Sequence, residues 1–302
     1  MAWGPCLQRW LTLIAVVMLL VGFGPMARQV QGADDLAALS RQVSRLHDQG
    51  KYTEALPIAK RYVTLARRER GEEHTEFASA IAWLATLYRL QGRYSEAEPL
   101  FQRSLALYEK ALGRDHQHVS TMLNHLATLY KDQGRYSEAE PLFKRSLALY
   151  EKAVGRNHDH VGTALNNLAA LYRAQGRYAE AEPLYQRSLA IREKALGPDH
   201  PHVSVALHDL ASLHKDQGRY AEAEPLYQRS LAISEKALGP AHPEVGTAMD
   251  SLALLYVRQG RVAEAEPVHK RSLAIREKTL GPDHPHVGKS LSNLAHSIHD
   301  AV

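Results

Sequence analysis

Residues 201–242 read PHVSVALHDLASLHKDQGRYAEAEPLYQRSLAISEKALGPAH, and closely similar stretches of 42 residues lie on both sides without an insertion. The dipeptide Gln-Gly marks this period through the chain, at Gln49-Gly50, Gln91-Gly92, Gln133-Gly134, Gln175-Gly176, Gln217-Gly218 and Gln259-Gly260. A repeat of this length is typical of proteins in which small units stack to bury a shared apolar face. The sequence therefore predicts a repeat architecture rather than ordinary globular domains.

Each repeat contains two segments whose apolar residues are spaced three and four apart. In residues 201–242 the first segment includes Leu207, Leu210 and Ala211, and the second includes Ala223 and Tyr227. This spacing predicts two amphipathic helices. Gly218 lies between them, where the end of a helix favours a left-handed backbone that a side chain would strain.

The corner between repeats is marked by Gly197, Pro198, Asp199 and His200. Glycine suits the position after a helix and proline cannot continue one, so we expect the second helix to end here and Asp199 to cap the next helix. The pattern predicts six helix pairs, at about 35–70, 76–112, 118–154, 160–196, 202–238 and 244–280, followed by a capping helix at 286–299.

Small and large residues follow one another in a fixed order within each repeat, as in Leu126, Ala127, Tyr130, Gly134, Tyr136, Ala139, Phe143 and Leu147. In this order the chain resembles tetratricopeptide repeat (TPR) proteins, in the 42-residue variety of kinesin light chains and many bacterial relatives. It departs from the motif at Leu123, where the signature has tryptophan, at Ala127, where it has glycine, and in a second helix lengthened to Gly155.

The resemblance implies an all-α fold, a right-handed superhelical solenoid of antiparallel helix pairs. It also implies a concave face, formed by the first helices, that receives short peptide segments. The long heptad segment by which kinesin light chains join the motor has no counterpart here, so motor association is not expected.

The N-terminal segment, residues 1–32, differs from the repeats. It holds Arg9, an apolar run from Leu11 to Phe23, no acidic residue, and Val30 and Gly32 at its end. These features are typical of a secretory signal peptide, so we expect cleavage after Gly32 and an exported protein, periplasmic or secreted, of bacterial type. The alternative is an uncleaved inner-membrane anchor at residues 10–27. The TPR solenoid is predicted to span residues 33–302.

The formal charge of +4 arises from 37 basic and 33 acidic residues, and the basic residues are spread along the chain with acidic ones between them, so no nucleic-acid partner is predicted. No nucleophile elbow, phosphate-binding glycine loop or HExxH motif is present, so we predict no enzymatic activity and no cofactor. The only cysteine, Cys6, precedes the apolar run, so no disulfide is expected after cleavage.

Histidines two residues apart recur at the corners and raise the question of a metal site. They are His116 with His118, His158 with His160, His200 with His202, and His284 with His286. Each pair lies a whole helix pair from the next and has no cysteine beside it, so we predict no metal site. We expect the first histidine to cap or pack at the start of a helix.

Two neighbouring positions of the first helices vary between repeats although the core positions do not. One row is Ala82, Asn124, Asn166, His208, Asp250 and Ser292, and the other is Trp83, His125, Asn167, Asp209, Ser251 and Asn293. Amide side chains can both donate to and accept from a peptide backbone. A third row, Arg89, Lys131, Arg173 and Lys215, adds positive charge suited to an acidic group or a C-terminal carboxylate.

These rows predict a peptide-binding groove formed by Asn124, His125, Lys131, Asn166, Asn167, Arg173, His208, Asp209, Lys215 and Asp250. The alternative interpretation is that they are solvated polar residues of amphipathic helices. A column of arginines on the second helices, Arg103, Arg145, Arg187, Arg229 and Arg271, has a different role. Because it recurs in every repeat, with Glu96, Glu138, Glu180, Glu222 and Glu264 nearby, it is predicted to hold repeats together.

The predicted function is that of a non-catalytic scaffold or adaptor that binds a peptide or a partner protein in the concave groove. Contact with a membrane is expected only through the N-terminal segment, if that segment stays uncleaved. The alternative is a structural, self-assembling spacer without peptide recognition, which sizing of the chain would reveal. A metal-buffering protein is a third possibility, and it would require bound ions that disappear when His200 and His202 are replaced.

Overall fold

A computed structural model describes residues 24–281, 287, 288 and 290–292, and within them the chain is all-helical, with no β-strand. The apolar run Leu11–Phe23, the pair His284 and His286, and most of the predicted helix 286–299 lie outside the described residues. Residues 287, 288 and 290–292 are helical. Within the described part of the chain, no helix is both long and apolar enough to span a bilayer.

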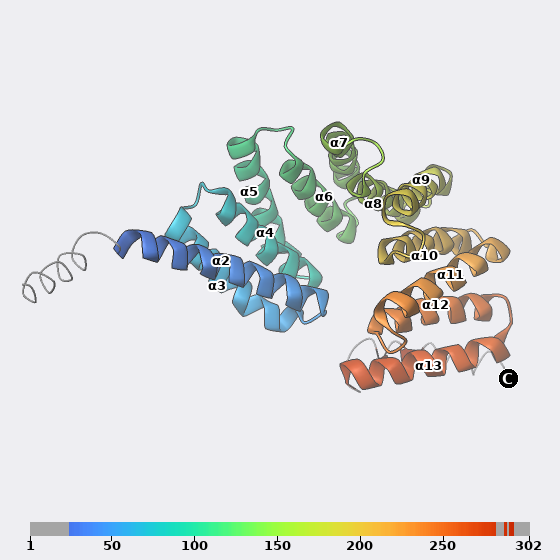
Figure 1. Ribbon diagram of the computed structural model, residues 1–302. Helices are drawn as coiled ribbons and strands as arrows, with labels where there is room; N and C mark the ends of the chain where they lie inside the picture. Colours follow the sequence, from blue (N-terminus) through green and yellow to red (C-terminus); the bar gives the residue numbers. More distant parts are fainter. Residues whose placement is uncertain (1–23, 282–286, 289, 293–302) are drawn as a thin grey trace, which may run out of the picture. The chain divides into compact units, whose positions relative to one another are not determined.

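The chain divides into two compact bodies, one up to Arg114 and one from Asp115 onward (Figure 1). The N-terminal body contains α2 (Gly24–Asp48), α3 (Tyr52–Arg70), α4 (Thr75–Leu90) and α5 (Tyr94–Leu112). The C-terminal body contains α6 (Gln117–Asp132), α7 (Tyr136–Val154), α8 (Asp159–Ala174), α9 (Tyr178–Leu196), α10 (Pro201–Asp216), α11 (Tyr220–Leu238), α12 (Pro243–Arg258) and α13 (Val262–Leu280). Helix α2 begins before Asp35 and runs through Gly32.

These helices form six consecutive pairs in the described residues, from pair 1 (α2 and α3) to pair 6 (α12 and α13). In the C-terminal body the helices of each pair pack on each other, and the second helix packs on the first helix of the next pair. The first helices also contact one another directly, α6 with α8, α8 with α10 and α10 with α12. This stacking is that of a solenoid, the predicted fold class.

The turn inside each pair depends on a glycine with a left-handed backbone. Gly218 has φ +75° and Gly176 has φ +72°, as predicted from the Gln-Gly marker. The N–H of the residue after each glycine donates back into the first helix, as in Arg219 N to His214 O at 2.9 Å. Three residues, such as Gln217, Gly218 and Arg219, therefore suffice to reverse the chain direction between helices.

Each first helix except α2 is capped at its start by histidine. The Nδ1 atom of His200 accepts a hydrogen bond from the N–H of His202 at 3.1 Å, and His74, His116, His158 and His242 cap their helices in the same way. The predicted cap Asp199 was wrong, because its carboxylate pairs with Lys236 instead. The prediction that the first histidine of each pair caps a helix is confirmed in the described residues.

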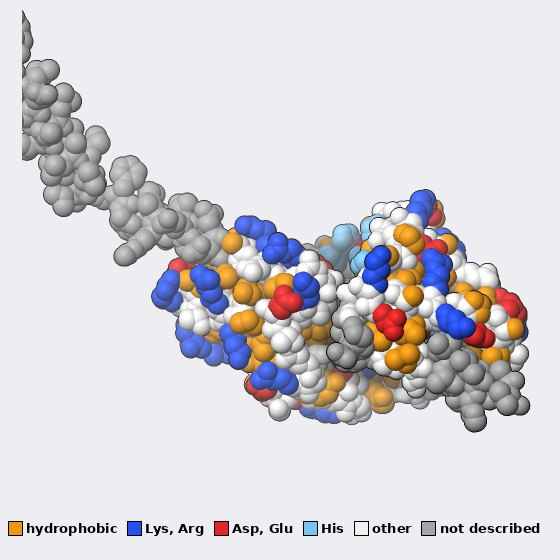
Figure 2. All heavy atoms as spheres, turned by 90° about the horizontal axis from the view of Figure 1, so that it is seen from below, with side chains coloured by type: hydrophobic (Ala, Val, Ile, Leu, Met, Phe, Trp, Pro, Cys, Tyr) orange, Lys and Arg blue, Asp and Glu red, His pale blue; other side chains and the backbone are white. Residues whose placement is uncertain are grey.

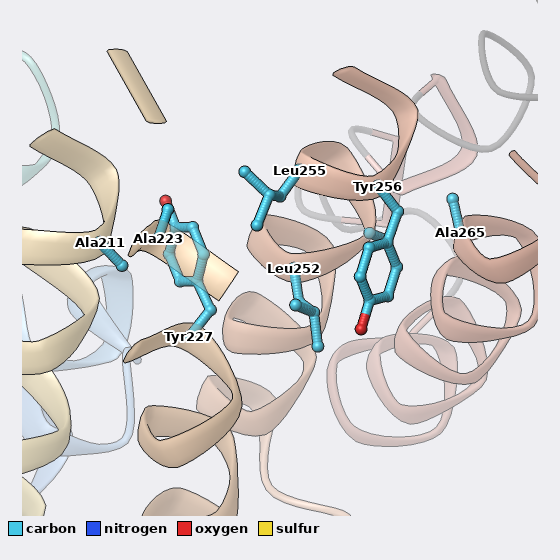
Figure 3. Close-up of a cluster of buried hydrophobic side chains, with 8 residues drawn as sticks. Ala211, Ala223, Tyr227, Leu252, Leu255, Tyr256 and Ala265 are labelled. Atoms are coloured by element: carbon cyan, nitrogen blue, oxygen red, sulfur yellow. The ribbon is translucent and has the colours of Figure 1, made fainter. Parts of the chain in front are cut away.

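The core of the C-terminal body continues from pair to pair. Tyr227 of α11 is 1% exposed and lies between Ala211 of α10 and Leu252 and Leu255 of α12 (Figure 3). Alanines at the contact points, such as Ala223, allow the helices to approach closely enough to bury the tyrosine ring. Each pair thus completes its core with side chains of its neighbour, as the repeat pattern requires.

A buried serine joins the two helices of each pair from pair 2 to pair 6, whereas pair 1 has Tyr62 at the equivalent position. The hydroxyl of Ser188 on α9 donates to the backbone carbonyl of Gly162 on α8 at 2.7 Å, and Ser104, Ser146, Ser230 and Ser272 make the same bond in their own pairs. Each of these serines is 0–1% exposed. Since the carbonyl already belongs to a helix, this bond fixes the register between the helices without interrupting either one.

The predicted arginine column joins neighbouring pairs. Arg187, Arg229 and Arg271 bind Glu151, Glu193 and Glu235 of the preceding second helix at 2.6, 2.6 and 2.7 Å. The interface role is confirmed, but the glutamates predicted to serve it were wrong. Glu180, Glu222 and Glu264 instead pair with the turn arginines Arg177, Arg219 and Arg261, three residues earlier.

The turn arginines form a second set of contacts between pairs. Arg177 hydrogen-bonds to Glu180, to Gln175 and to Glu140 of the preceding pair, each at 2.7 Å, while its guanidinium lies 4.0 Å from the ring centre of Tyr172. Hydrogen bonds from Arg177 and then Lys144 lower the pKa of Glu140 to about 2. Figure 2 shows basic, acidic and apolar side chains distributed together over one face of the surface.

Candidate functional site

The polar rows of the first helices form a connected strip in the C-terminal body. Side chains 43 residues apart are joined: Asn167 Nδ2 donates to Asn124 Oδ1 at 3.0 Å, Asn166 Nδ2 donates to Asp209 Oδ2 at 2.7 Å, and His208 Nε2 is hydrogen-bonded to Ser251 Oγ at 2.9 Å. These contacts cross from α6 to α8, from α8 to α10 and from α10 to α12. We call these six residues the polar strip.

Most of the strip is only half-buried, so its side chains reach the surface. Asn124, Asn167, His208, Asp209 and Ser251 are of this kind, and His125 lies half-buried beside Asn124 on α6. Asn166 differs, because it is 7% exposed and its amide is held by Asp209. The rows therefore lie together in the structure, but the amide of Asn167 is bound to Asn124 and that of Asn166 to Asp209.

Asp209 carries a negative charge within the strip. Burial raises the pKa of this carboxyl, but His208 and the amide of Asn166 oppose that effect, and Arg173 adds a favourable charge. The outcome is a pKa below the ordinary value for aspartate. Asp209 is therefore a permanent acceptor in the middle of the strip at neutral pH.

The row of basic residues on the first helices, which includes Lys131, Arg173 and Lys215, carries less net positive charge than the sequence indicated. Arg173 Nε binds Asp216 Oδ2 at 2.6 Å, Lys215 lies 3.6 Å from the same residue, and Lys131 lies 3.3 Å from Asp132. Burial, with Arg173 nearby, lowers the pKa of Lys215 although Asp216 opposes the shift. The expected preference for an acidic ligand therefore loses its main support, since aspartates accompany these cations.

Asp250 does not belong to the accessible strip. It is 7% exposed and its carboxylate receives Arg276 Nη1 at 2.5 Å and Ser290 Oγ at 3.0 Å, while His269 Nδ1 lies 3.3 Å away. Burial raises its pKa, but His269, Ser272 and Arg276 bring it below the usual value. The prediction of Asp250 as a groove residue is corrected, because its charge balances a buried arginine.

Sequence reasoning also missed residues that shape this face. Asp216 directly follows Lys215, and that adjacency was a usable signal for charge compensation. The partnership of Asp250 with Arg276 had no such signal, because 26 residues separate them. A pattern of residues on the first helices alone does not reveal which side chains of the second helices contact them.

Chemically, the strip offers donors and acceptors to another polypeptide. Amide, imidazole and carboxylate groups lie side by side over four helices. The corner histidines are occupied as helix caps, and the described residues contain no group of three or more side chains placed to hold a metal ion. The groups of the polar strip are suited to forming hydrogen bonds with another polypeptide.

The comparisons with known proteins agree with this architecture. The family model described as tetratricopeptide repeat matches residues 76–152, 160–236, 203–278 and 251–297, which is more than half of the chain. The comparison with curated proteins found no match.

Among solved structures, a putative kinesin light chain from Podosopora anserina with nearly identical TPR-like repeats is 29% identical, with a TM-score of 0.56. The match covers 68% of this chain and 98% of that one. BtubC (BKLC) from P. vanneervenii is 23% identical, with a TM-score of 0.59, over 82% of this chain and 94% of that one. With the repeat, the turn glycines and the stacked helix pairs, the match of the family model over more than half of the chain shows that the chain belongs to the tetratricopeptide repeat family.

Proposed function

We propose that the polar strip binds an extended segment of a partner polypeptide, and that the protein is a non-catalytic scaffold or adaptor. The TPR fold supports a role in protein–protein interaction. One observation carries the proposal further: polar side chains that differ from repeat to repeat form a linked surface, whereas positions that join the repeats are the same throughout. Side chains that vary on a constant framework are suited to recognising one ligand at several points.

The chemistry of the strip favours recognition of a peptide backbone. Asn124, Asn167 and Asp209 supply amide and carboxylate groups that match the N–H and C=O groups of an extended chain. A purely acidic ligand is less well matched, because Asp209, Asp216 and Asp132 lie among the cations. We therefore expect the partner segment to be polar and extended, with little net charge of its own.

A bulky substitution at Ala170 tests the proposal. Ala170 is half-buried on α8, three and four residues after Asn167 and Asn166, and therefore on the same helix face. Peptides are first selected on the wild-type chain from a phage-displayed random library. These peptides should not bind the Ala170→Trp variant. Ala190→Trp, on an exposed position of α9, is the control and should retain them.

Replacing Asn166 and Asn167 by alanine is a poorer test than the substitution of Ala170. Both amides are hydrogen-bonded to neighbouring helices, so their loss would lower stability together with any affinity. Equal peptide binding by Ala170→Trp and Ala190→Trp, with unchanged melting temperatures, would refute the strip as the binding surface. Concentration-dependent assembly in sedimentation, with no peptide selected, would favour the self-assembling spacer.

We also propose that the protein is exported, periplasmic or secreted, with residues 1–32 as a cleaved signal. The support is Arg9 ahead of the apolar run from Leu11 to Phe23, together with the absence of acidic residues. Expression of the full chain in a bacterium with an N-terminal mass measurement tests this. A mature chain starting at Ala33 in the periplasmic fraction supports it, and an intact chain in the membrane fraction favours the anchor at residues 10–27.

A further inference from the structure

One position of the second helix holds a large buried residue in pairs 2, 3, 4 and 6, a buried alanine, Ala66, in pair 1, and a small residue in pair 5. Tyr108, Tyr150, Arg192 and Arg276 occupy it with exposures of 6, 7, 5 and 3%. In pair 5 the equivalent residue, 42 positions after Arg192, is Ser234. Pair 5 therefore lacks the side chain that fills this space in pairs 2, 3, 4 and 6.

The partner of that side chain has changed as well. Tyr150 Oη is hydrogen-bonded to Thr121 Oγ1 at 2.7 Å, while Arg192 and Arg276 donate to Thr163 and Thr247, each at 3.1 Å. The equivalent of these threonines in pair 5 is Val205. A polar contact that recurs in pairs 3, 4 and 6 has been replaced on both sides, by a smaller residue and by an apolar one.

The consequence is an open pocket of about 170 Å³ between α10, α11 and α12. Val205, Leu238, Ala248 and Pro201 provide apolar walls, Ser234 lies at the vacated position, and Glu244 also lines it. Val205 is 48% exposed, the largest value among the large hydrophobic side chains at the surface of the described residues. An apolar side chain that is this exposed in a concave site is typical of a ligand-binding pocket.

The serine hydroxyls of the pocket need no ligand of their own. Ser204 Oγ lies 2.7 Å from Ser234 Oγ and 2.9 Å from the carbonyl of Ser230, and Ser230 Oγ donates to the carbonyl of Ser204 at 2.9 Å. Each hydroxyl is thus satisfied within the protein. An apolar group can enter the pocket without leaving a buried polar group unpaired.

The features that accommodate arginine elsewhere are missing from pair 5. Arg192 and Arg276 each pack over a glycine, since a Cβ on Gly162 or Gly246 would lie 3.3 Å from the arginine, whereas pair 5 has Ser204 there. Their carboxylate partners Asp159 and Asp250 are replaced by Pro201 and His208. A guanidinium group would therefore lack both space and counter-charge in this pocket.

Pair 3 shows instead that an aromatic ring suits this setting. It has serine at the equivalent position, Ser120, and there the space is filled by Tyr150. In addition, an apolar cavity of about 150 Å³ in a protein is large enough to bind benzene. The volume of the pair 5 pocket is similar to that value.

We propose that the pocket at Ser234 accepts an aromatic side chain of the partner polypeptide. The proposal rests on the function proposed for the polar strip and adds an anchor to it, because His208 both belongs to the strip and lines the pocket. A backbone lying along the strip would thus insert one ring beside His208. Glu244 disfavours a carboxylate at the same site.

The first experiment measures the pocket alone. The full chain is labelled with ¹³C at alanine methyl groups, and the Ala248 signal is followed during titration with N-acetyl-phenylalaninamide, N-acetyl-tyrosinamide and N-acetyl-tryptophanamide. A saturable shift of Ala248 with at least one of these supports the proposal. Absence of a shift with all three, or tighter binding of N-acetyl-argininamide, overturns it.

Variants copied from pair 3 make the test specific. Ser234→Tyr with Val205→Thr reproduces Tyr150 and Thr121, so it should fill the pocket and abolish the Ala248 shift. Val205→Thr alone leaves the pocket open and is the matched control. Conversely, Tyr150→Ser with Thr121→Val should open a second site, detected through the methyl of Ala164, which packs near Tyr150. Retention of the shift in the filled variant overturns the assignment.

The second experiment separates this inference from the proposed function. Peptides selected on the wild-type chain should contain an aromatic residue and should lose affinity for the filled variant. If they bind the strip but keep their affinity for that variant, the anchor is refuted and the scaffold function stands. If the amides bind Ala248 but no peptide is selected, the pocket remains an aromatic site and the proposed function fails.

Discussion

Gly162 and Arg192 behave as a matched pair, and their coupling can be measured. Arg192 is 5% exposed and donates to the carbonyl of His202 and to Thr163, each at 3.1 Å. A Cβ on Gly162 would lie 3.3 Å from its Cγ and 3.5 Å from its Nε. We therefore predict that Gly162→Ser destabilises the protein by forcing the arginine stem to move.

The magnitude follows from two opposing effects. Replacing glycine by serine in a helix interior gains about 0.5 kcal/mol in propensity, while overpacking a buried site costs about 1 to 3 kcal/mol. The expected net loss in apparent free energy of unfolding is about 0.5 to 2.5 kcal/mol. Gly288→Ser is the control, because Gly288 occupies the equivalent position and a Cβ there meets nothing within 4 Å.

A double variant completes the cycle. In pair 3, Ser120 and Tyr150 occupy the positions equivalent to Gly162 and Arg192, so serine and tyrosine are compatible at these two positions. Gly162→Ser with Arg192→Tyr should therefore be more stable than the sum of the single changes predicts, with a coupling of about 1 kcal/mol or more. Urea unfolding followed by circular dichroism measures all four proteins. Additivity within about 0.5 kcal/mol would refute the reasoning.

Three further outcomes are expected. Burial and then the charge of Arg219 hold the pKa of His214 below its ordinary value. The folded state therefore binds a proton at His214 less readily than the unfolded state does. Stability should accordingly fall as the pH drops below about 6.5. His214→Tyr copies the contact between Tyr172 and Arg177. The melting temperature of this variant should depend less on pH than that of the wild type between neutral and mildly acidic conditions. Equal pH dependence of the two melting temperatures would contradict this prediction. His200→Ala should lower the stability by about 0.5 to 1 kcal/mol in urea unfolding through loss of the helix cap, and His200→Asn should restore most of it. Gly176→Ala should cost about 1 kcal/mol in the same assay purely through its φ of +72°, because a Cβ there touches nothing within 4 Å; an unchanged midpoint would count against this interpretation of the turn.

Much of the fold was predictable because its signals repeat. The Gln-Gly marker indicated the turns, and Gly218 has the expected left-handed backbone. The boundary between the two bodies after Arg114 was not predictable, because the Gly113-Arg114 corner resembles Gly155-Arg156. His200 rather than Asp199 caps α10, since the competing partner of Asp199, Lys236, lies 37 residues away in the sequence.

The candidate site was predictable only in outline. The variable rows did identify residues that lie together, such as Asn167 with Asn124. What lay beyond the sequence was the contribution of the second helix, which supplies Arg276 to Asp250 and leaves an open space at Ser234. Such partnerships join residues about 26 to 30 positions apart, and a pattern read along one helix does not contain them.

The arginine contacts between pairs bear on how such a chain changes in length during evolution. Arg187, Arg229 and Arg271 reach back to the preceding second helix with the same chemistry at each step. Duplication or deletion of a whole 42-residue segment therefore recreates an existing interface and needs no new one. The number of modules is free to drift, whereas the pocket at Ser234, which belongs to a single module, is inherited or lost with that module.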